Sequence, residues 1–170
     1  VRAVAVQSGA NRFASIGRDR QLFVWDADAK PRHFVSPPGM VRSLEFSPDG
    51  STLWGGGWEN LFKWDTDDGQ LKVLPTDHWG LISSIDYVPT LDVLATISRI
   101  NDSSVYFLDP NTGMTERTFT PQQLCGGAIA MSPDGRYLAT TGDDGAVRMW
   151  DLSIGASVQP VTVVSGSPTD

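Results

Sequence analysis

The residues best suited to chemistry are a histidine, a carboxylate and a hydroxyl group near the middle of the chain. His78, Asp102 and a neighbouring hydroxyl could form the triad of a hydrolase, in which the carboxylate orients the imidazole and the imidazole activates the hydroxyl. That chemistry also requires an exposed nucleophile and donors for an oxyanion. The sequence around these residues indicates neither, so a structural role is the better interpretation.

Two further stretches match ligand-binding motifs only in part. Asp65–Gly69 resembles the start of a calcium loop, but it is one residue short of the required spacing, and Thr76 stands where a bidentate glutamate is needed. Gly55–Gly57 could begin a phosphate-binding loop, but no helix and no Lys-Ser/Thr pair follow. We therefore expect a solvated turn at the first stretch, and no metal and no cofactor anywhere in the chain.

The chain also has too few nitrogen and sulfur ligands for a zinc site. It contains two histidines, His33 and His78, and one cysteine, Cys125, without the spacing of ligand pairs. A single cysteine excludes an internal disulfide. We expect His33 on the surface or on an edge strand, and Cys125 as a bystander thiol.

The elements that would position these residues are short strands joined by tight turns, and Ser132–Leu152 shows them most clearly. Ser132–Gly135 has proline second, aspartate third and glycine at the exit, which is typical of a type I turn. Tyr137–Thr141 and Ala146–Trp150 are strand-like runs on either side of a second tight turn. Together they predict an antiparallel hairpin, which is only marginally stable unless it packs against something else.

This hairpin recurs along the chain with a period near 42 residues. A dipeptide ending in aspartate closes each copy, at spacings of 39, 44 and 42 residues: Trp25-Asp26, Trp64-Asp65, Leu108-Asp109 and Trp150-Asp151. An apolar run precedes each hairpin, namely Val1–Val6, Val41–Phe46, Ile82–Tyr87 and Gly126–Met131. A fourth run follows each dipeptide, namely Pro31–Val35, Gln70–Leu74, Met114–Phe119 and Gln159–Val164. Four strands at this period are typical of a propeller blade.

The chain therefore resembles four consecutive blades of the WD-repeat (WD40-type) β-propeller family, over essentially its whole length. Three aspartates lie six residues before the Trp position of their repeat, namely Asp19, Asp102 and Asp144. His78 precedes Ile82 by four residues, as the family's Gly-His element does. The resemblance implies an all-β fold of four four-stranded antiparallel blades, at about residues 1–39, 40–80, 81–124 and 125–165.

The resemblance also implies a structural role for the repeated polar residues. In the family, a histidine, an aspartate, a hydroxyl and a tryptophan form a hydrogen-bonded chain inside a blade, and each bond contributes about 0.5–1.5 kcal/mol. The residues at these positions are Ser15, Asp19, Trp25, Trp64, His78, Thr96, Asp102, Thr140, Asp144 and Trp150. No blade has all four, since the first and fourth lack the histidine and the third has Leu108 in place of tryptophan. We expect softer blades than in a consensus repeat, with the second blade the softest.

The second blade departs most from the pattern, at Gly55–Asn60. Its hairpin turn is one residue shorter than that of the first blade, and the expected aspartate is missing. Counting back from Trp64 puts Trp58 at the aspartate position, whereas aligning forward from Val41 puts Glu59 there. The consecutive glycines indicate either positive φ angles or a close approach of another segment.

Residues that the blades do not need are candidates for binding a partner. In the family, loops between the second and third strands and between successive blades lie on one face, the usual binding face. We expect the contacts there to come from Arg18, Arg20, Trp58, Glu59, Trp79 and Arg99. Tryptophan and arginine are enriched at binding hot spots. The alternative is that Trp58 and Trp79 only cap local apolar surface.

Composition limits the remaining possibilities. The net charge of −7 disfavours a nucleic-acid surface, and no run of apolar residues is long enough for a membrane span. By resemblance we expect a non-enzymatic scaffold that binds a peptide or protein in the cytoplasm or nucleus. The alternatives are a purely structural segment, or an enzyme or redox propeller whose inner strands would hold a metal or quinone. Those strands offer only Glu45 and Asp86.

The last expectation concerns whether the propeller closes. The chain begins at Val1, in an inner strand, and four blades are the lower limit for a closed propeller. We expect an open arc, in which the first and fourth blades expose apolar faces. Such faces favour either self-association or additional blades that complete the propeller.

Overall fold

The computed structural model describes residues 1–26, 28, 30–100, 102, 104–119, 126–154 and 162–165, with only the backbone at 154 and 162–165. In this part of the chain the fold is all-β, with four antiparallel sheets of four strands and one short 3₁₀ turn, η1 (Leu152–Ile154). Within each sheet, every strand pairs with the next in sequence. This confirms the predicted fold. The expectation for Cys125 lies outside the described residues.

The strands follow the predicted apolar runs closely. The first sheet contains β1 (Ala3–Val6), β2 (Phe13–Ile16), β3 (Leu22–Trp25) and β4 (Pro31–Phe34). The second contains β5 (Ser43–Phe46), β6 (Thr52–Gly56), β7 (Asn60–Asp65) and β8 (Leu71–Pro75). The third contains β9 (Leu81–Val88), β10 (Val93–Arg99), β11 (Val105–Leu108) and β12 (Thr115–Phe119). The fourth contains β13 (Gly126–Met131), β14 (Tyr137–Gly142), β15 (Ala146–Asp151) and β16 (Thr162–Ser165). The exact limits of the four repeats stay a prediction.

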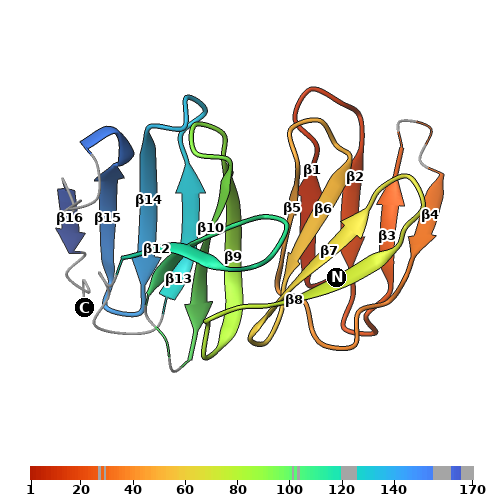
Figure 1. Cartoon of the computed structure of the whole chain (residues 1–170), viewed down its shortest axis with the longest axis horizontal. Coiled ribbons are helices and arrows are strands. Elements are labelled where there is room, and N and C mark those ends of the chain that lie inside the picture. Colours follow the sequence, from red (N-terminus) through yellow and green to blue (C-terminus); the bar gives the residue numbers. More distant parts are fainter. Residues whose placement is uncertain are drawn as a thin grey trace, which may run out of the picture.

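The four sheets form an open arc around their first strands. Strand β5 contacts both β1 and β9, and β13 contacts β9 and β10, so each sheet lies beside the next. In Figure 1 the first sheet (red and orange) and the fourth (blue) lie at opposite sides of the molecule. Strands β4 and β16 are outermost. The arrangement is the open partial propeller that the sequence predicts.

The hydrophobic core lies between successive sheets rather than within one. Strand β1 shows the underlying alternation, because Ala3 and Ala5 face the second sheet while Val4 and Val6 are exposed. The junction of the first and second sheets buries Trp64 completely, and that of the third and fourth buries Trp150. Burial of apolar surface contributes about 25 cal/mol per Å², so these junctions supply most of the stabilisation.

The turns between the first two strands of a sheet form as their residue types predict. Gly50 donates its N–H to Ser47 O, and Gly135 donates to Ser132 O, each at 2.8 Å. Both glycines have positive φ angles, 73° and 69°. That region is costly for residues with a Cβ, so these turns depend on glycine at the exit.

Glycine is required in the second sheet for a different reason. A Cβ on Gly55 would lie 2.8 Å from the Trp64 ring, and one on Gly56 would lie 2.6 Å from Ile82. Neither glycine has a positive φ angle. Of the two explanations that the sequence left open, close approach of neighbouring side chains is therefore the correct one.

Candidate functional site

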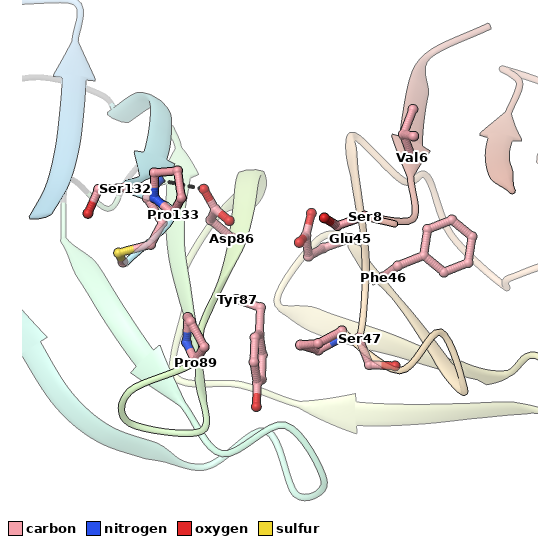
Figure 2. Close-up of a pocket in the computed structure, with 12 residues that line it drawn as sticks. Val6, Ser8, Glu45, Phe46, Ser47, Asp86, Tyr87, Pro89, Ser132 and Pro133 are labelled. Carbon is pink, nitrogen blue, oxygen red and sulfur yellow. Dashed lines mark hydrogen bonds between the residues drawn. The ribbon is translucent and has the colours of Figure 1, made fainter. Parts of the chain in front are cut away.

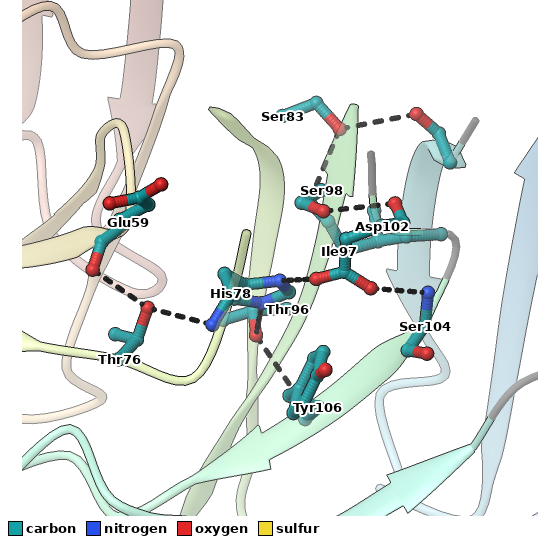
Figure 3. Close-up of polar contacts among 11 residues, drawn as sticks. Glu59, Thr76, His78, Ser83, Thr96, Ile97, Ser98, Asp102, Ser104 and Tyr106 are labelled. Atoms are coloured by element: carbon teal, nitrogen blue, oxygen red, sulfur yellow. Dashed lines mark hydrogen bonds and ion pairs between the residues drawn. The ribbon is translucent and has the colours of Figure 1, made fainter. Parts of the chain in front are cut away.

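A buried polar network lies in the third sheet and joins the segment before β9 to the β10–β11 hairpin (Figure 3). His78 is 2% exposed, and its Nδ1 lies 2.7 Å from Asp102 Oδ2. Since a carboxylate only accepts, Nδ1–H is the donor. Nε2 lies 2.8 Å from Thr96 Oγ1. The structure thus brings together His78, Asp102 and Thr96.

Asp102 is held as a carboxylate by its partners. Burial alone would raise its pKa, but the hydrogen bonds from His78 and from the Ser104 N–H lower it below the ordinary value. Thr96 is completely buried, so a substrate cannot reach its hydroxyl. The arrangement has the contacts of a triad without an accessible nucleophile, which favours the structural interpretation.

The fourth sheet contains a different part of the same pattern. Trp150 Nε1 donates to Thr140 Oγ1 at 3.0 Å, and both residues are buried. Asp144 accepts from the Ala146 N–H and forms an ion pair with Arg148 at 2.7 Å. An arginine from the same hairpin therefore takes the place that histidine has in the third sheet.

The first and second sheets contain smaller parts of the pattern. Trp25 Nε1 donates to Ser15 Oγ at 3.1 Å, and Asp19 accepts from the Gln21 N–H within its own turn. Trp64 is buried, as a structural role requires, but its Nε1 donates at 2.8 Å to the backbone oxygen of Val35. Trp64 does not bond a hydroxyl of its own sheet, because the second sheet has glycines where the hydroxyl residue would be.

The turn between β6 and β7 settles which residue replaces the missing aspartate. In the first and fourth sheets, the residue after the aspartate has a positive φ angle, 64° at Arg20 and 72° at Gly145. In the second sheet that conformation belongs to Glu59, with φ 58°. Trp58 therefore occupies the aspartate position. Its ring is 45% exposed and donates to Glu59 Oε1 at 3.2 Å.

The connections that were expected to bind a partner lie together at one end of the sheets. We call this the loop face, defined by residues 18–20, 36–40, 57–60, 76–80, 99, 100, 102 and 142–145. Contacts run along it from sheet to sheet: Arg20 Nη1 donates to Pro38 O at 3.0 Å, and the Glu59 N–H donates to Gly80 O at 3.0 Å. Gly80 in turn lies against the backbone of Arg99.

A pocket of about 480 Å³ opens on the loop face between the second and third sheets. Its lining comprises Glu59, Asn60, Pro75, Thr76, Asp77, His78 and Trp79. Trp79 is 74% exposed beside it, whereas His78 is buried at its base. Of the expected binding residues, the structure gathers Trp58, Glu59 and Trp79 here.

The three arginines are placed differently. Arg18 and Arg20 lie on the first sheet, away from the pocket, and Arg20 is already bonded to Pro38. Arg99 lies near Gly80 but pairs with Asp143 of the fourth sheet at 3.8 Å. None of the three arginines lines the pocket.

Sequence reasoning missed several residues of the pocket wall, above all Asn60, Pro75 and Asp77. Thr76 donates its N–H and its hydroxyl to Glu59 O, at 3.1 and 3.0 Å, and so fixes the wall of the pocket. The available signal was their position directly beside Trp79 and Glu59. No repeat offset marks them.

A second pocket, of about 300 Å³, lies at the opposite end of the inner strands and is lined by all four sheets (Figure 2). Glu45 and Asp86 belong to its wall. Burial, followed by the charge of Asp86, raises the pKa of Glu45 to about 8. Asp86 accepts the Met131 N–H at 2.6 Å, and the Glu45 carboxyl accepts from the backbone of Tyr87. Each acid therefore bonds the inner strand of the following sheet.

The described residues contain neither a cluster of metal ligands nor a helix that could cross a membrane. No three His, Cys, Asp or Glu side chains there gather closely enough to hold a metal ion. Asp65 accepts the Asp67 N–H at 2.8 Å, so the calcium-like stretch is a self-bonded turn. No helix in the described part is long and apolar enough to cross a membrane.

Comparison with known proteins identifies the repeat. Residues 125–151 match the family model described as WD domain, G-beta repeat. Protein tipD of Dictyostelium discoideum is 36% identical over 164 residues, and the nuclear distribution protein PAC1 of Arthroderma benhamiae is 39% identical over 178. The chain belongs to the WD-repeat family. The residues that match the family model correspond to the first three strands of the fourth sheet, β13 to β15.

The match covers only part of these relatives. It includes 91% and 96% of this chain but spans about a quarter of tipD and two fifths of PAC1, at 26% and 38%. The solved structure of a mitotic checkpoint complex contains a chain that this WD-repeat chain resembles with a TM-score of 0.80 over 99% of its residues. That chain is 21% identical and half covered, so the likeness shows the shared fold.

Proposed function

We propose that this WD-repeat chain is a non-enzymatic scaffold whose loop face binds a peptide or protein segment. The observation that carries the proposal is Trp79, which is 74% exposed beside a pocket although its neighbours on both sides are fixed. An exposed tryptophan on an ordered surface offers much area to a partner at a small ordering cost. The solved chain with the same fold comes from a protein complex.

The loop around Trp79 is ordered before any partner binds. His78 is bonded at both ring nitrogens, and Gly80 fits against the backbone of Ile100 and accepts from the Glu59 N–H. A partner therefore meets a preformed surface.

The charges of the pocket indicate what kind of segment would bind. Glu59 and Asp77 are exposed carboxylates in its wall. A lysine or arginine side chain laid across the Trp79 ring would gain a cation–π contact, and its charge would lie near both acids. We therefore propose a basic peptide segment as the partner. The intracellular location stays a prediction.

A displayed library of random 12-residue peptides, selected on the whole chain, tests the proposal. We expect enriched peptides rich in Lys or Arg, whose affinity, measured by fluorescence polarisation, falls at least about tenfold in Trp79→Ala. Met114→Ala is the matched control, since Met114 is 69% exposed in the β11–β12 turn at the other end of the third sheet. Affinities unchanged by Trp79→Ala would contradict the assignment and leave this residue as a cap on local apolar surface.

A further inference from the structure

Ile100, in the hairpin turn after β10, has a strained backbone conformation on the loop face. Its φ angle is 73°, in the left-handed region. That region is unfavourable for residues with a Cβ, and a β-branched residue there is a clear outlier. The Ile100 side chain is also 47% exposed, so packing against the rest of the chain does little to offset the strain.

Positive φ angles are accommodated differently at the two ends of the sheets. At the end opposite the loop face, the described turns have glycine at these positions: Gly9, Gly50, Gly69, Gly113 and Gly135. The exception there is Asp92, and aspartate is one of the few other residues that tolerate this region. On the loop face, the residues with positive φ are Arg20, Glu59, Ile100 and Gly145. The loop face thus keeps side chains, including an isoleucine, where the backbone favours glycine.

Ile100 lies directly beside the Trp79 loop. Strands β9 and β10 pair as far as Leu81 and Arg99, so Gly80 and Ile100 come next on the two segments. A Cβ on Gly80 would collide with the backbone oxygen of Ile100, which shows that the two backbones are in direct contact. Two exposed apolar side chains, Trp79 and Ile100, therefore belong to touching segments of one surface.

The charges beside these two side chains are mainly negative. Arg99, the nearest cation in sequence, pairs with Asp143 at 3.8 Å. Glu59 and Asp77 line the adjoining pocket, and neither forms an ion pair with another described residue. The surface thus offers apolar contacts next to two carboxylates, which suits a segment that carries both an apolar and a basic side chain.

We propose that Ile100 is a second anchor for the peptide segment that binds at Trp79, an inference that rests on the function proposed above. The segment places a lysine or arginine over the Trp79 ring and an apolar side chain on Ile100. Neighbouring strands lie about 4.8 Å apart and an extended peptide advances about 3.3 Å per residue, so the two peptide residues are within about three positions of each other. Binding, rather than folding, accounts for an isoleucine in this strained conformation.

The substitution Ile100→Gly separates binding from folding. Glycine adopts the observed φ angle without strain, which outweighs the greater freedom of the unfolded chain. We therefore expect a midpoint of urea unfolding at least as high as that of the wild type. The variant also loses the apolar side chain, so its affinity for the peptides selected on the wild-type chain should fall at least about fivefold in fluorescence polarisation. Ile100→Leu keeps an apolar side chain and should bind within about twofold of the wild type.

Two further measurements show whether the peptide contacts Ile100 itself. Leu91→Ala is the matched control and should not change the affinity, since Leu91 is 42% exposed in the β9–β10 turn at the other end of the same sheet. In the selected peptides, the apolar residue nearest the lysine or arginine is replaced by alanine. This should weaken binding to the wild type about fivefold and leave binding to Ile100→Gly unchanged, a non-additivity expected of groups in contact.

The outcomes distinguish this inference from the proposed function. Peptides that lose affinity in Trp79→Ala but not in Ile100→Gly would refute the second anchor and leave the proposed function intact. Peptides whose affinity is unchanged in both variants would refute both. A lower urea midpoint in Ile100→Gly would show that the isoleucine stabilises the fold, which would contradict its assignment to binding.

Discussion

The third and fourth sheets place an aspartate at the same position of a hairpin turn but satisfy it in different ways. Asp102 binds the imidazole of His78, which lies 24 residues earlier, in the connection before β9. Asp144 binds Arg148, four residues later in the same hairpin. Both pairs are largely buried, with side-chain exposures of 5% or less in the first and 11–13% in the second. Only the first pair joins two separate segments of the chain.

This difference explains why the candidate binding surface lies where it does. The residue next to His78 is Trp79, so the bond that stabilises the third sheet also fixes the exposed tryptophan. The Asp144–Arg148 pair lies within its own hairpin. We therefore infer that a structural motif of the repeat also positions the proposed binding surface in the third sheet.

Replacing each of the two aspartates in turn tests whether the two pairs contribute differently to stability, and it has the largest expected effect. We expect Asp102→Ala to lower the free energy of unfolding by about 3 kcal/mol, because it leaves the His78 N–H buried without an acceptor. We expect a smaller loss for Asp144→Ala, because the Asp144–Arg148 pair is the more exposed of the two, at 11–13%. Urea unfolding followed by circular dichroism measures both. Equal losses would show that the two anchors are equivalent.

The tryptophan of each motif gives a second, smaller contrast. Trp150→Phe removes a buried bond to Thr140 and some packing volume, so we expect a loss of about 2 kcal/mol. Trp25→Phe should cost less than about 1 kcal/mol, because Trp25 is only half-buried. The midpoints of urea unfolding compare the variants. An unchanged midpoint in Trp150→Phe would exclude the hydrogen bond as a source of stability.

The acids between the sheets predict a pH dependence above pH 5 that the Asp102 anchor cannot produce. The pKa of Glu45 is raised to about 8, so the folded state keeps a proton that the unfolded state releases near pH 4.5. Its contribution to stability is therefore complete below about pH 4.5 and is lost as the pH rises towards 8. The pKa of Asp102 is lowered, so its contribution to stability is present at neutral pH and is lost only in acid.

We expect the free energy of unfolding to fall by about 1 kcal/mol between pH 5.5 and 8, a value reduced because water reaches the half-buried carboxyl. Urea titrations at several pH values measure the slope. Glu45→Gln should flatten most of it and leave the remainder to Asp86, whose pKa burial also raises. A slope that is the same in this variant would refute the role of Glu45.

Much of the fold could be predicted because the repeat leaves a strong trace in the sequence. The strands alternate apolar residues, and turns such as Ser132–Gly135 need glycine at a fixed place. The contacts within the third sheet followed from offsets between His78, Asp102 and the Leu108 position. Such local regularities can be seen in a single sequence because every repeat packs in the same way.

The features of the fold and site that the sequence did not predict depend on contacts between different repeats. Trp64 bonds to Val35 of the preceding sheet, and Asp77 joins Trp79 in a pocket only because β8 and β9 meet there. The place of Trp58 became clear from the positive φ angle of Glu59. No offset within one repeat encodes these relations, so they require the three-dimensional arrangement.

The central claim is that the buried His78–Asp102 bond holds the Trp79 loop in its binding conformation. Amide hydrogen exchange of residues 57–82 in the native chain tests it most directly, since the amides of Glu59, Thr76 and Ile82 are bonded across this region. The account predicts faster exchange there in Asp102→Ala, and unchanged exchange there in Asp144→Ala. Exchange in this segment that is the same in Asp102→Ala as in the wild type would contradict it.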